Sequence, residues 1–146
     1  MTIRGPGRVF VGDNVFIDGR GHPVTPFTHH VDALISIGSN SFLNGTRFGC
    51  QKKIVIGDYA ILGDARILDT DFHSIYPDRW SNDAIVRSEP ITIGKNVWVA
   101  AAAAILKGVK IGDNSVVGFG SIVTEDVPNN CVVVGNPAKV VKRLTH

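Results

Sequence analysis

The chain has 146 residues, of which 44% are hydrophobic, and a formal net charge of +2. This length suits one domain with a single core, and no basic run indicates binding to nucleic acid or to a membrane surface. No stretch approaches the roughly 18 apolar residues of a membrane-spanning helix, and residues 1–14 lack the apolar segment of a signal peptide. Cys50 and Cys131 are too few for a disulfide framework and lack metal-ligand spacing, so we expect reduced thiols and a cytoplasmic protein.

Branched aliphatic residues recur six positions apart, first at Val11 and Ile17 and again at Ile37 and Leu43. A period of six does not fit an α-helix, whose faces recur every three and four residues. It fits short strands that each form one side of a triangular coil of about 18 residues. Between these two coils, residues 18–32 are rich in Gly, Pro and His and predict a protruding loop.

After a slip of one residue, the same pattern predicts another turn, formed by Ile56, Leu62 and Leu68. Arg66 occupies a corner position where a small residue is expected, so either the turn is displaced there or Arg66 points outward. Residues 74–90 then predict a second protruding loop, which contains aromatic side chains and Arg79. This loop is either a wall that faces a ligand or a flap that contacts a neighbouring subunit.

The repeat is most regular between residues 93 and 128. An aliphatic residue stands at every sixth position, namely Ile93, Val99, Ile105, Ile111, Val117 and Val123. A small or branched residue follows each after four positions: Val97, Ala103, Val109, Ser115, Ser121 and Val127. We expect the first set to point inward and the second to fill the corners. Residues 129–137 predict an exit turn, and residues 138–144 a short terminal helix within a cap at about 138–146 that covers the open end.

The predicted fold is therefore all-β, with residues 1–146 forming one parallel β-helix domain of hexapeptide repeats and a short C-terminal helix. Within it, His73 ends the last hexad before the second loop, where a rigid strand end holds a side chain that a ligand can reach. Alternation along a strand places Asp71 and His73 on one face, so the carboxylate can orient the imidazole. The same position suits a surface histidine in a turn equally well.

Five segments point to a family when taken in order: Asp71–Ile75, Pro90–Val99, Ile105–Val109, Gly118–Thr124 and Val134–Lys139. Together they resemble the left-handed β-helix acyltransferases, in the branch of capsule and lipopolysaccharide sugar O-acetyltransferases related to maltose and galactoside acetyltransferases. The resemblance covers about residues 35–144. It implies a left-handed prism, a homotrimer with active sites between neighbouring prisms, and acetyl-CoA as co-substrate without a metal.

The resemblance also implies catalytic roles. His73 takes the place of the general base, whose neutral imidazole removes the proton of a hydroxyl as the oxygen attacks the thioester directly. Asn44 matches an asparagine that faces the same cleft, although a polar residue in such a turn also serves to satisfy backbone groups. The backbone N–H near Ala101 matches the donor that stabilises the oxyanion. No acyl-enzyme is implied, because neither cysteine lies in a Cys-His motif.

The coenzyme site follows from the same match. Trp98 matches the tryptophan that flanks the pantetheine arm, although its ring also suits packing against another subunit. Gly120, Thr124 and Lys139 match positions that line the coenzyme site in the family, and Arg143 near the end of the chain is expected close to the phosphates. Two residues depart from the family. Ala100 replaces a usual glycine, and Phe119 replaces a small residue, where it narrows the channel, stacks on adenine or covers a trimer surface.

The predicted function is acetyl-CoA-dependent O-acetylation of a hydroxyl on a sugar, nucleotide sugar or polysaccharide. Three alternatives remain open from the residues: an N-acyltransferase on an amino sugar, a weak or inactive binding scaffold, and a γ-class carbonic anhydrase. The last requires three zinc-binding histidines from neighbouring coils. His73 lacks a second histidine about five residues away, and His29 and His30 lie in the first loop.

Overall fold

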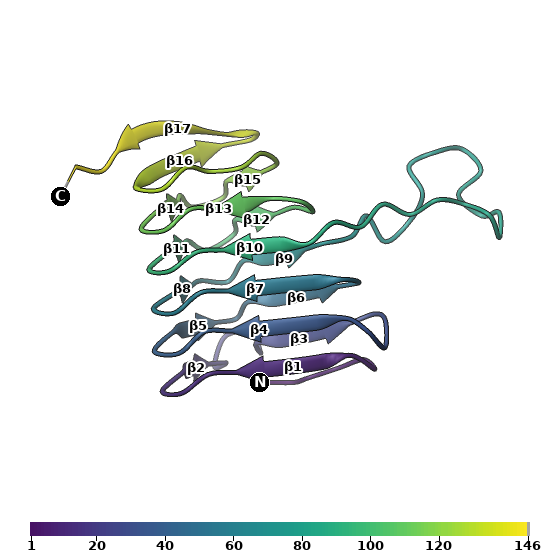
Figure 1. Cartoon of the computed structure of the whole chain (residues 1–146), viewed down its shortest axis with the longest axis horizontal. Helices are drawn as coiled ribbons and strands as arrows, with labels where there is room; N and C mark the ends of the chain where they lie inside the picture. Colours follow the sequence, from purple (N-terminus) through teal and green to yellow (C-terminus); the bar gives the residue numbers. More distant parts are fainter. Residues whose placement is uncertain (146) are drawn as a thin grey trace.

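The structure is a computed structural model that describes residues 1–145, and every regular element in this range is a β-strand. The strands form a parallel β-solenoid of five three-stranded turns followed by a hairpin (Figure 1). The five turns contain, in order, β1 (Arg8–Val11), β2 (Phe16–Asp18), β3 (Thr25–Thr28); β4 (Leu34–Ile37), β5 (Phe42–Asn44), β6 (Arg47–Cys50); β7 (Lys53–Ile56), β8 (Ile61–Leu62), β9 (Arg66–Leu68); β10 (Ile91–Ile93), β11 (Trp98–Val99), β12 (Ala104–Ile105); β13 (Lys110–Ile111), β14 (Val116–Val117), β15 (Ile122–Val123). The hairpin is β16 (Cys131–Gly135) and β17 (Ala138–Arg143).

Each strand pairs with the strand one turn away, which builds three sheets. Sheet I has the order β1-β4-β7-β10-β13, sheet II the order β17-β16-β14-β11-β8-β5-β2, and sheet III the order β15-β12-β9-β6-β3. All pairs within the five turns are parallel, and only β16 and β17 are antiparallel. We call the boundary where sheet II turns into sheet III the II–III edge, and that between sheets III and I the III–I edge.

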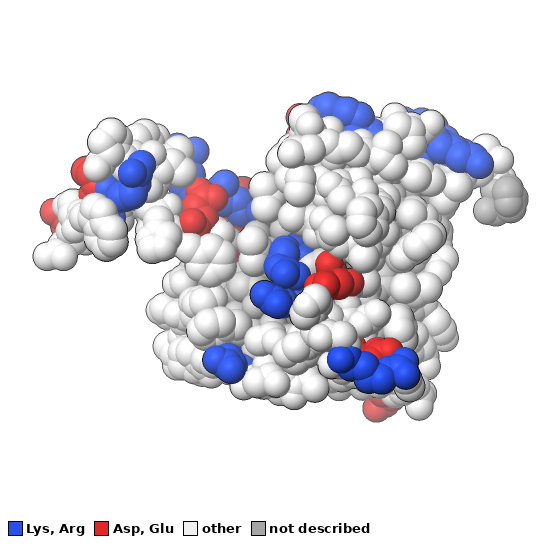
Figure 2. All heavy atoms as spheres, turned by 180° about the vertical axis from the view of Figure 1, so that it is seen from behind, with Lys and Arg blue, Asp and Glu red and all other residues white. Residues whose placement is uncertain are grey.

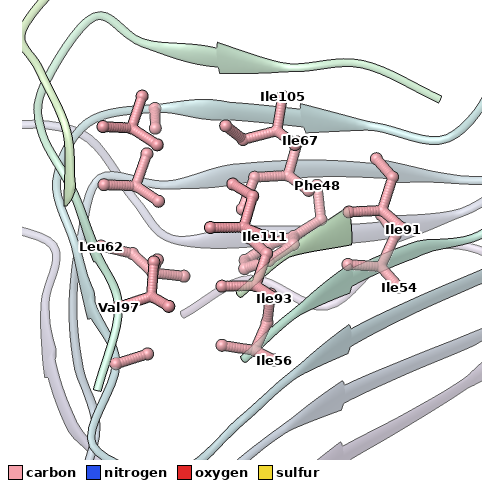
Figure 3. Packing of buried hydrophobic residues seen from close by; sticks show 14 of the residues in the cluster. Phe48, Ile54, Ile56, Leu62, Ile67, Ile91, Ile93, Val97, Ile105 and Ile111 are labelled. Carbon is pink, nitrogen blue, oxygen red and sulfur yellow. The ribbon is translucent and has the colours of Figure 1, made fainter. Parts of the chain in front are cut away.

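The hexad pattern correctly predicted the core. All six aliphatic positions from Ile93 to Val123 are at most 2% exposed, and all six corner positions from Val97 to Val127 are buried. Side chains of successive turns stack in columns along the axis, as the isoleucines of sheet I do beside Phe48 and Ile67 of sheet III (Figure 3). Strand alternation leaves every second side chain outside, and the inward side chains form the buried columns that supply the hydrophobic stabilisation. Sheet I contributes two such columns, one through Ile54 and Ile91 and one through Ile56 and Ile93.

In the turn that contains Arg66, the observed register differs from the predicted one. Ile67, rather than Leu68, points inward, and Ala65 fills the corner with no exposed surface. The inward positions Leu62 and Ile67 are therefore five residues apart, because the II–III edge is one residue shorter there than in the later turns. Arg66 consequently points outward, where its guanidinium pairs with the Asp64 carboxylate at 3.1 Å.

The first predicted loop, residues 18–32, was too long. It contains β3, which pairs in parallel with β6 over four residues. Pro26 in this strand made the segment look like a loop, but β3 lies at the end of sheet III, and a proline is tolerated in a terminal strand.

The predicted C-terminal helix was wrong. Residues 138–143 form β17, antiparallel to β16. The exposed end strand of sheet II has unpaired backbone groups, and pairing with β17 satisfies them better than a detached helix would. The cap of the solenoid is thus a hairpin. No helix long and apolar enough to cross a membrane occurs within residues 1–145.

Residues 69–90 leave the solenoid between β9 and β10 and extend well away from it (Figure 1). Thr70 and Ser88 form an antiparallel bridge at the base of this excursion, and their hydroxyls are 2.8 Å apart. We refer to residues 71–88 as the arm. Its apolar side chains are exposed to solvent: Phe72, Ile75, Tyr76, Trp80, Ile85 and Val86.

Candidate functional site

The arm carries His73 at the III–I edge, close to where the chain leaves sheet III. The residue is exposed, and its backbone N–H donates to the Asp71 carbonyl oxygen at 2.7 Å. The Asp71 carboxylate, however, forms an ion pair with the Lys107 ammonium at 2.8 Å and no hydrogen bond with the imidazole. The structure therefore supports the predicted accessibility of His73 but not its predicted orientation by the Asp71 side chain. Lys107 instead ties the base of the arm to the next turn of the solenoid.

Asn44 and Ala101 lie on the same II–III edge, two turns apart. Leu43, Leu62 and Val99 are in register in sheet II, so the residues after them stack along this edge. A Cβ atom at Gly63 would lie 2.8 Å from the Ala101 nitrogen, so only glycine allows this close approach of the two turns.

The turn that holds Ala101 leaves a donor available. Ala102 has a left-handed conformation (φ 58°), and its N–H donates to the Asp64 carbonyl oxygen at 2.8 Å. The Ala101 N–H has no acceptor within residues 1–145. A backbone donor without a partner on a rigid edge can stabilise a developing oxyanion. Ala100, which replaces the family's glycine, fits this turn and donates its own N–H to the Val117 carbonyl oxygen.

A polar cluster below Ala101 was not predicted. The Asp64 carboxylate lies 2.8 Å from His22 Nδ1 and accepts a hydrogen bond from Arg66 Nη1. Partial burial acts to raise the pKa of Asp64, but the hydrogen bonds from Arg66 and His22 outweigh it and lower the pKa below its usual value. His22 and Asp64 are 42 residues apart in the sequence, so no local pattern connects them. The single hint in the sequence was Arg66, a charged residue at a repeat position where a small residue is expected.

The predicted coenzyme residues do not form one patch. Ala101 and Gly120 are neighbours at the II–III edge, where the Gly120 N–H donates to the Ala101 carbonyl oxygen at 3.1 Å. Trp98 on β11 points outward from sheet II and is half exposed, and Phe119 is 77% exposed. The other members lie elsewhere: Thr124 follows β15 at the III–I edge, and Lys139 and Arg143 lie on β17.

Polar contacts define the surroundings of the two basic residues on β17. The Lys139 ammonium lies 3.4 Å from the Glu125 carboxylate, and Arg143 Nη1 contacts the Cys131 sulfur. Among the described residues, no three His, Cys, Asp or Glu side chains are placed to hold a metal ion. The prism thus presents candidate groups for acyl transfer on two edges: His73 on the III–I edge and the Ala101 N–H on the II–III edge.

Comparisons with known proteins agree with the fold. Residues 90–125 match the family model described as bacterial transferase hexapeptide (six repeats). The galactoside O-acetyltransferase of Escherichia coli K12 is 35% identical over 135 residues, which cover 92% of this chain and 63% of that protein. The chain thus spans less than two thirds of that curated relative.

Two solved structures extend the comparison. A maltose O-acetyltransferase from Clostridium difficile 630 is 33% identical, with a TM-score of 0.68 over 95% of this chain and 68% of its own. A hexapeptide-repeat acetyltransferase from Vibrio cholerae O1 biovar eltor, solved with acetyl coenzyme A, is 27% identical, with a TM-score of 0.74 over 91% of this chain and 72% of its own. Sequence and fold therefore agree, and the chain belongs to the hexapeptide-repeat acetyltransferase family.

Proposed function

We propose that this protein transfers an acetyl group from acetyl-CoA to a sugar hydroxyl. The observation that carries the proposal is the 33% identity to a maltose O-acetyltransferase over 95% of this chain. The E. coli relative is likewise a galactoside O-acetyltransferase, which favours an oxygen acceptor on a sugar over an amine. An exposed imidazole and an unpartnered backbone N–H are two groups that this reaction needs.

In the proposed reaction, the neutral His73 imidazole accepts the proton of the sugar hydroxyl as its oxygen attacks the thioester carbonyl carbon. The tetrahedral intermediate carries its negative charge on the former carbonyl oxygen, which accepts a hydrogen bond from the Ala101 N–H. The C–S bond then breaks, and the imidazolium returns its proton to the leaving thiolate. General base catalysis of this kind contributes roughly 10²–10⁴-fold to the rate. Asn44, on the same edge as Ala101, is proposed to hold the acceptor.

The two groups lie on different edges of one prism, with sheet III between them. We therefore propose that a complete site forms between two copies of the chain, His73 coming from one copy and Ala101 from the next. The apolar arm supports this proposal, because Trp80 is 92% exposed and Ile85 70% exposed, a pattern typical of surfaces that another chain covers. In a closed ring of three copies, each arm packs against the next copy, so every arm is covered and every II–III edge receives a His73.

The coenzyme is proposed to lie along the II–III edge, above the acceptor. Trp98 and Phe119 offer exposed aromatic surfaces to the pantetheine arm and the adenine, and Gly120 leaves open space beside Ala101. Lys139, Arg143 and the Thr124 hydroxyl are candidates for contacts with the phosphates and ribose, within a site shared between copies.

A transfer assay tests the proposal. The purified chain is incubated with acetyl-CoA and a panel of sugars that offer hydroxyl or amine acceptors, and release of the free thiol is measured. His73→Ala is expected to reduce kcat by about 10²-fold or more while the melting temperature and coenzyme affinity are unchanged, because His73 is exposed and its imidazole has no ion pair or aromatic partner within residues 1–145. His30→Ala, a second exposed histidine near the same edge, is the matched control and should keep full activity.

Mixing variants tests the shared site. His73→Ala and Asn44→Ala chains are each expected to be impaired alone, and co-refolding them should restore part of the activity, because some interfaces then combine an intact His73 with an intact Asn44. Near-full activity of His73→Ala with a good acceptor would refute the mechanism. Failure of any mixture to recover activity, together with a monomeric mass by light scattering, would refute the shared site.

A further inference from the structure

We propose that the outer face of sheet III carries a subsite for an anionic sugar, in which Arg4 and Arg47 bind a carboxylate or phosphate group of the acceptor. This inference rests on the proposed transferase function for its reaction, and it adds a property of the acceptor. Neither the arm nor the coenzyme residues contribute to it.

A cavity of about 290 Å³ lies on this face between the first two turns of the solenoid. Its lining combines three kinds of residue: the arginines Arg4 and Arg47, the threonines Thr2 and Thr25, and the apolar residues Pro23, Phe27 and Phe48, of which Phe27 is exposed and Phe48 belongs to the core. An apolar floor with a few convergent polar groups is the usual composition of a small-molecule site. The volume is at the small end for such sites, which suits one sugar ring, with its C–H face on Phe27 and its charge toward the arginines.

The charges around this cavity are not balanced. Arg47 and Arg66 are in register on the neighbouring strands β6 and β9, and like charges directly opposite each other in a sheet are destabilising. Asp64 compensates Arg66, with which it forms an ion pair. Neither Arg47 nor Arg4 has a carboxylate within 4.0 Å in the described part of the chain.

Arg20, another arginine at this end of the solenoid, is neutralised. Arg20 pairs with Asp18 at 2.7 Å, and its hydrogen bonds lower the pKa of that carboxyl to about 2. Arg8 on sheet I also has no carboxylate within 4.0 Å among residues 1–145, so the distinctive feature of the cavity is that two uncompensated arginines line it together. A bound carboxylate or phosphate would balance their charge, since guanidinium groups bind both through paired N–H donors.

The cavity lies on the outer face of sheet III, which begins at the II–III edge that carries Asn44 and Ala101. Strands β3, β6, β9 and β12 lie at the back in Figure 1, and the space-filling view from behind shows a few charged clusters on a broad uncharged surface (Figure 2). Arg47 follows Asn44 by three residues across the II–III edge, two turns below Ala101. With neighbouring strands about 4.8 Å apart, the Arg47 rim of the cavity lies roughly 10 Å along the axis from Ala101, and the Phe27 level one turn below lies roughly 15 Å from it. An anionic ring held there would belong to the same oligosaccharide as the ring that receives the acetyl group, about two or three rings along the saccharide.

The test compares matched ligands on the full-length chain at low salt. Calorimetric dissociation constants are measured for cellobiose and the corresponding disaccharide that contains glucuronic acid, and for glucose and glucose 6-phosphate. The acidic member of one or both pairs is expected to bind at least tenfold more tightly, and the pair that shows the preference identifies the anion as carboxylate or phosphate. Arg47→Gln and Arg4→Gln should each reduce that preference about tenfold, and Arg47→Lys should retain part of it.

Arg8→Gln is the control. Arg8 is an exposed arginine on sheet I, so this substitution removes the same charge at a position away from the cavity. It should leave the preference intact. Equal affinities for acidic and neutral ligands, or a preference that survives both Arg47→Gln and Arg4→Gln in chains with a wild-type melting temperature, would overturn the subsite. Binding and thiol release separate the two proposals. An Arg47-dependent preference without any acetyl transfer would refute the transferase alone, whereas transfer that is indifferent to acceptor charge and to Arg47 would refute the subsite alone.

Discussion

Asp69 is the structural residue whose removal we expect to matter most. Its carboxylate has no exposed surface and accepts three backbone hydrogen bonds, from the N–H groups of Gln51, Lys52 and Lys53 at 2.7–2.8 Å. These bonds join the second and third turns at the III–I edge, where the arm leaves the solenoid. Asp69→Ala would leave three amides without their only acceptor in residues 1–145.

The expected loss follows from that count. An unsatisfied buried donor costs about 1–3 kcal/mol. Lys52 and Lys53 are exposed, so water can reach their amides after the carboxylate is removed, and the low end of the range applies to each. We therefore expect Asp69→Ala to lower the free energy of unfolding by about 3 kcal/mol, which corresponds to a fall of about 10 °C in the melting temperature.

The matched control is Asp113→Ala. Asp113 lies at an exposed corner, and its carboxylate accepts one backbone hydrogen bond, from Lys95 at 2.8 Å. Its removal should cost about 1 kcal/mol or less. Thermal unfolding followed by circular dichroism measures both variants. Equal melting temperatures for the two variants, or a fall of less than about 3 °C for Asp69→Ala, would refute the view that this carboxylate organises the edge.

Two further predictions concern the coenzyme and the buried thiol. Trp98→Ala should weaken coenzyme A binding at least tenfold in a calorimetric titration. Ile61 lies one turn below Trp98, in register on the same face, and Ile61→Ala should leave the affinity near the wild-type value. An unchanged affinity in Trp98→Ala would contradict the proposed pantetheine site. Burial, with the Asp69 carboxylate nearby, raises the pKa of Cys50 to about 12 from an ordinary value of 9.0. A raised thiol pKa stabilises the fold fully below pH 9, and this contribution is lost as the pH rises from 9 to 12. Between pH 9 and 12, the free energy of unfolding should thus fall more steeply for the wild type than for Cys50→Ala. Parallel pH profiles of the unfolding free energy for the two proteins would contradict this contribution of Cys50.

The sequence alone was sufficient to predict the solenoid and its core. An aliphatic residue at every sixth position can be buried only if each hexad forms one side of a coil, so Ile93, Val99 and Ile105 determined both the strands and the inward face. The resemblance in the segments around His73 and Trp98 also correctly indicated the family. These features are local or strictly periodic, and a single sequence displays them directly.

Long-range pairing decided the rest. Residues 138–143 form a strand because the end of sheet II offers unpaired backbone groups, a condition that the segment's own sequence does not reveal. Ala65 and Arg66 exchange their expected places because an edge is shortened by one residue, which reverses the side of the sheet that each faces. The Asp64–His22 contact and the Arg47–Arg66 register join residues on different turns, so only the stacking of the coils brings their charges together.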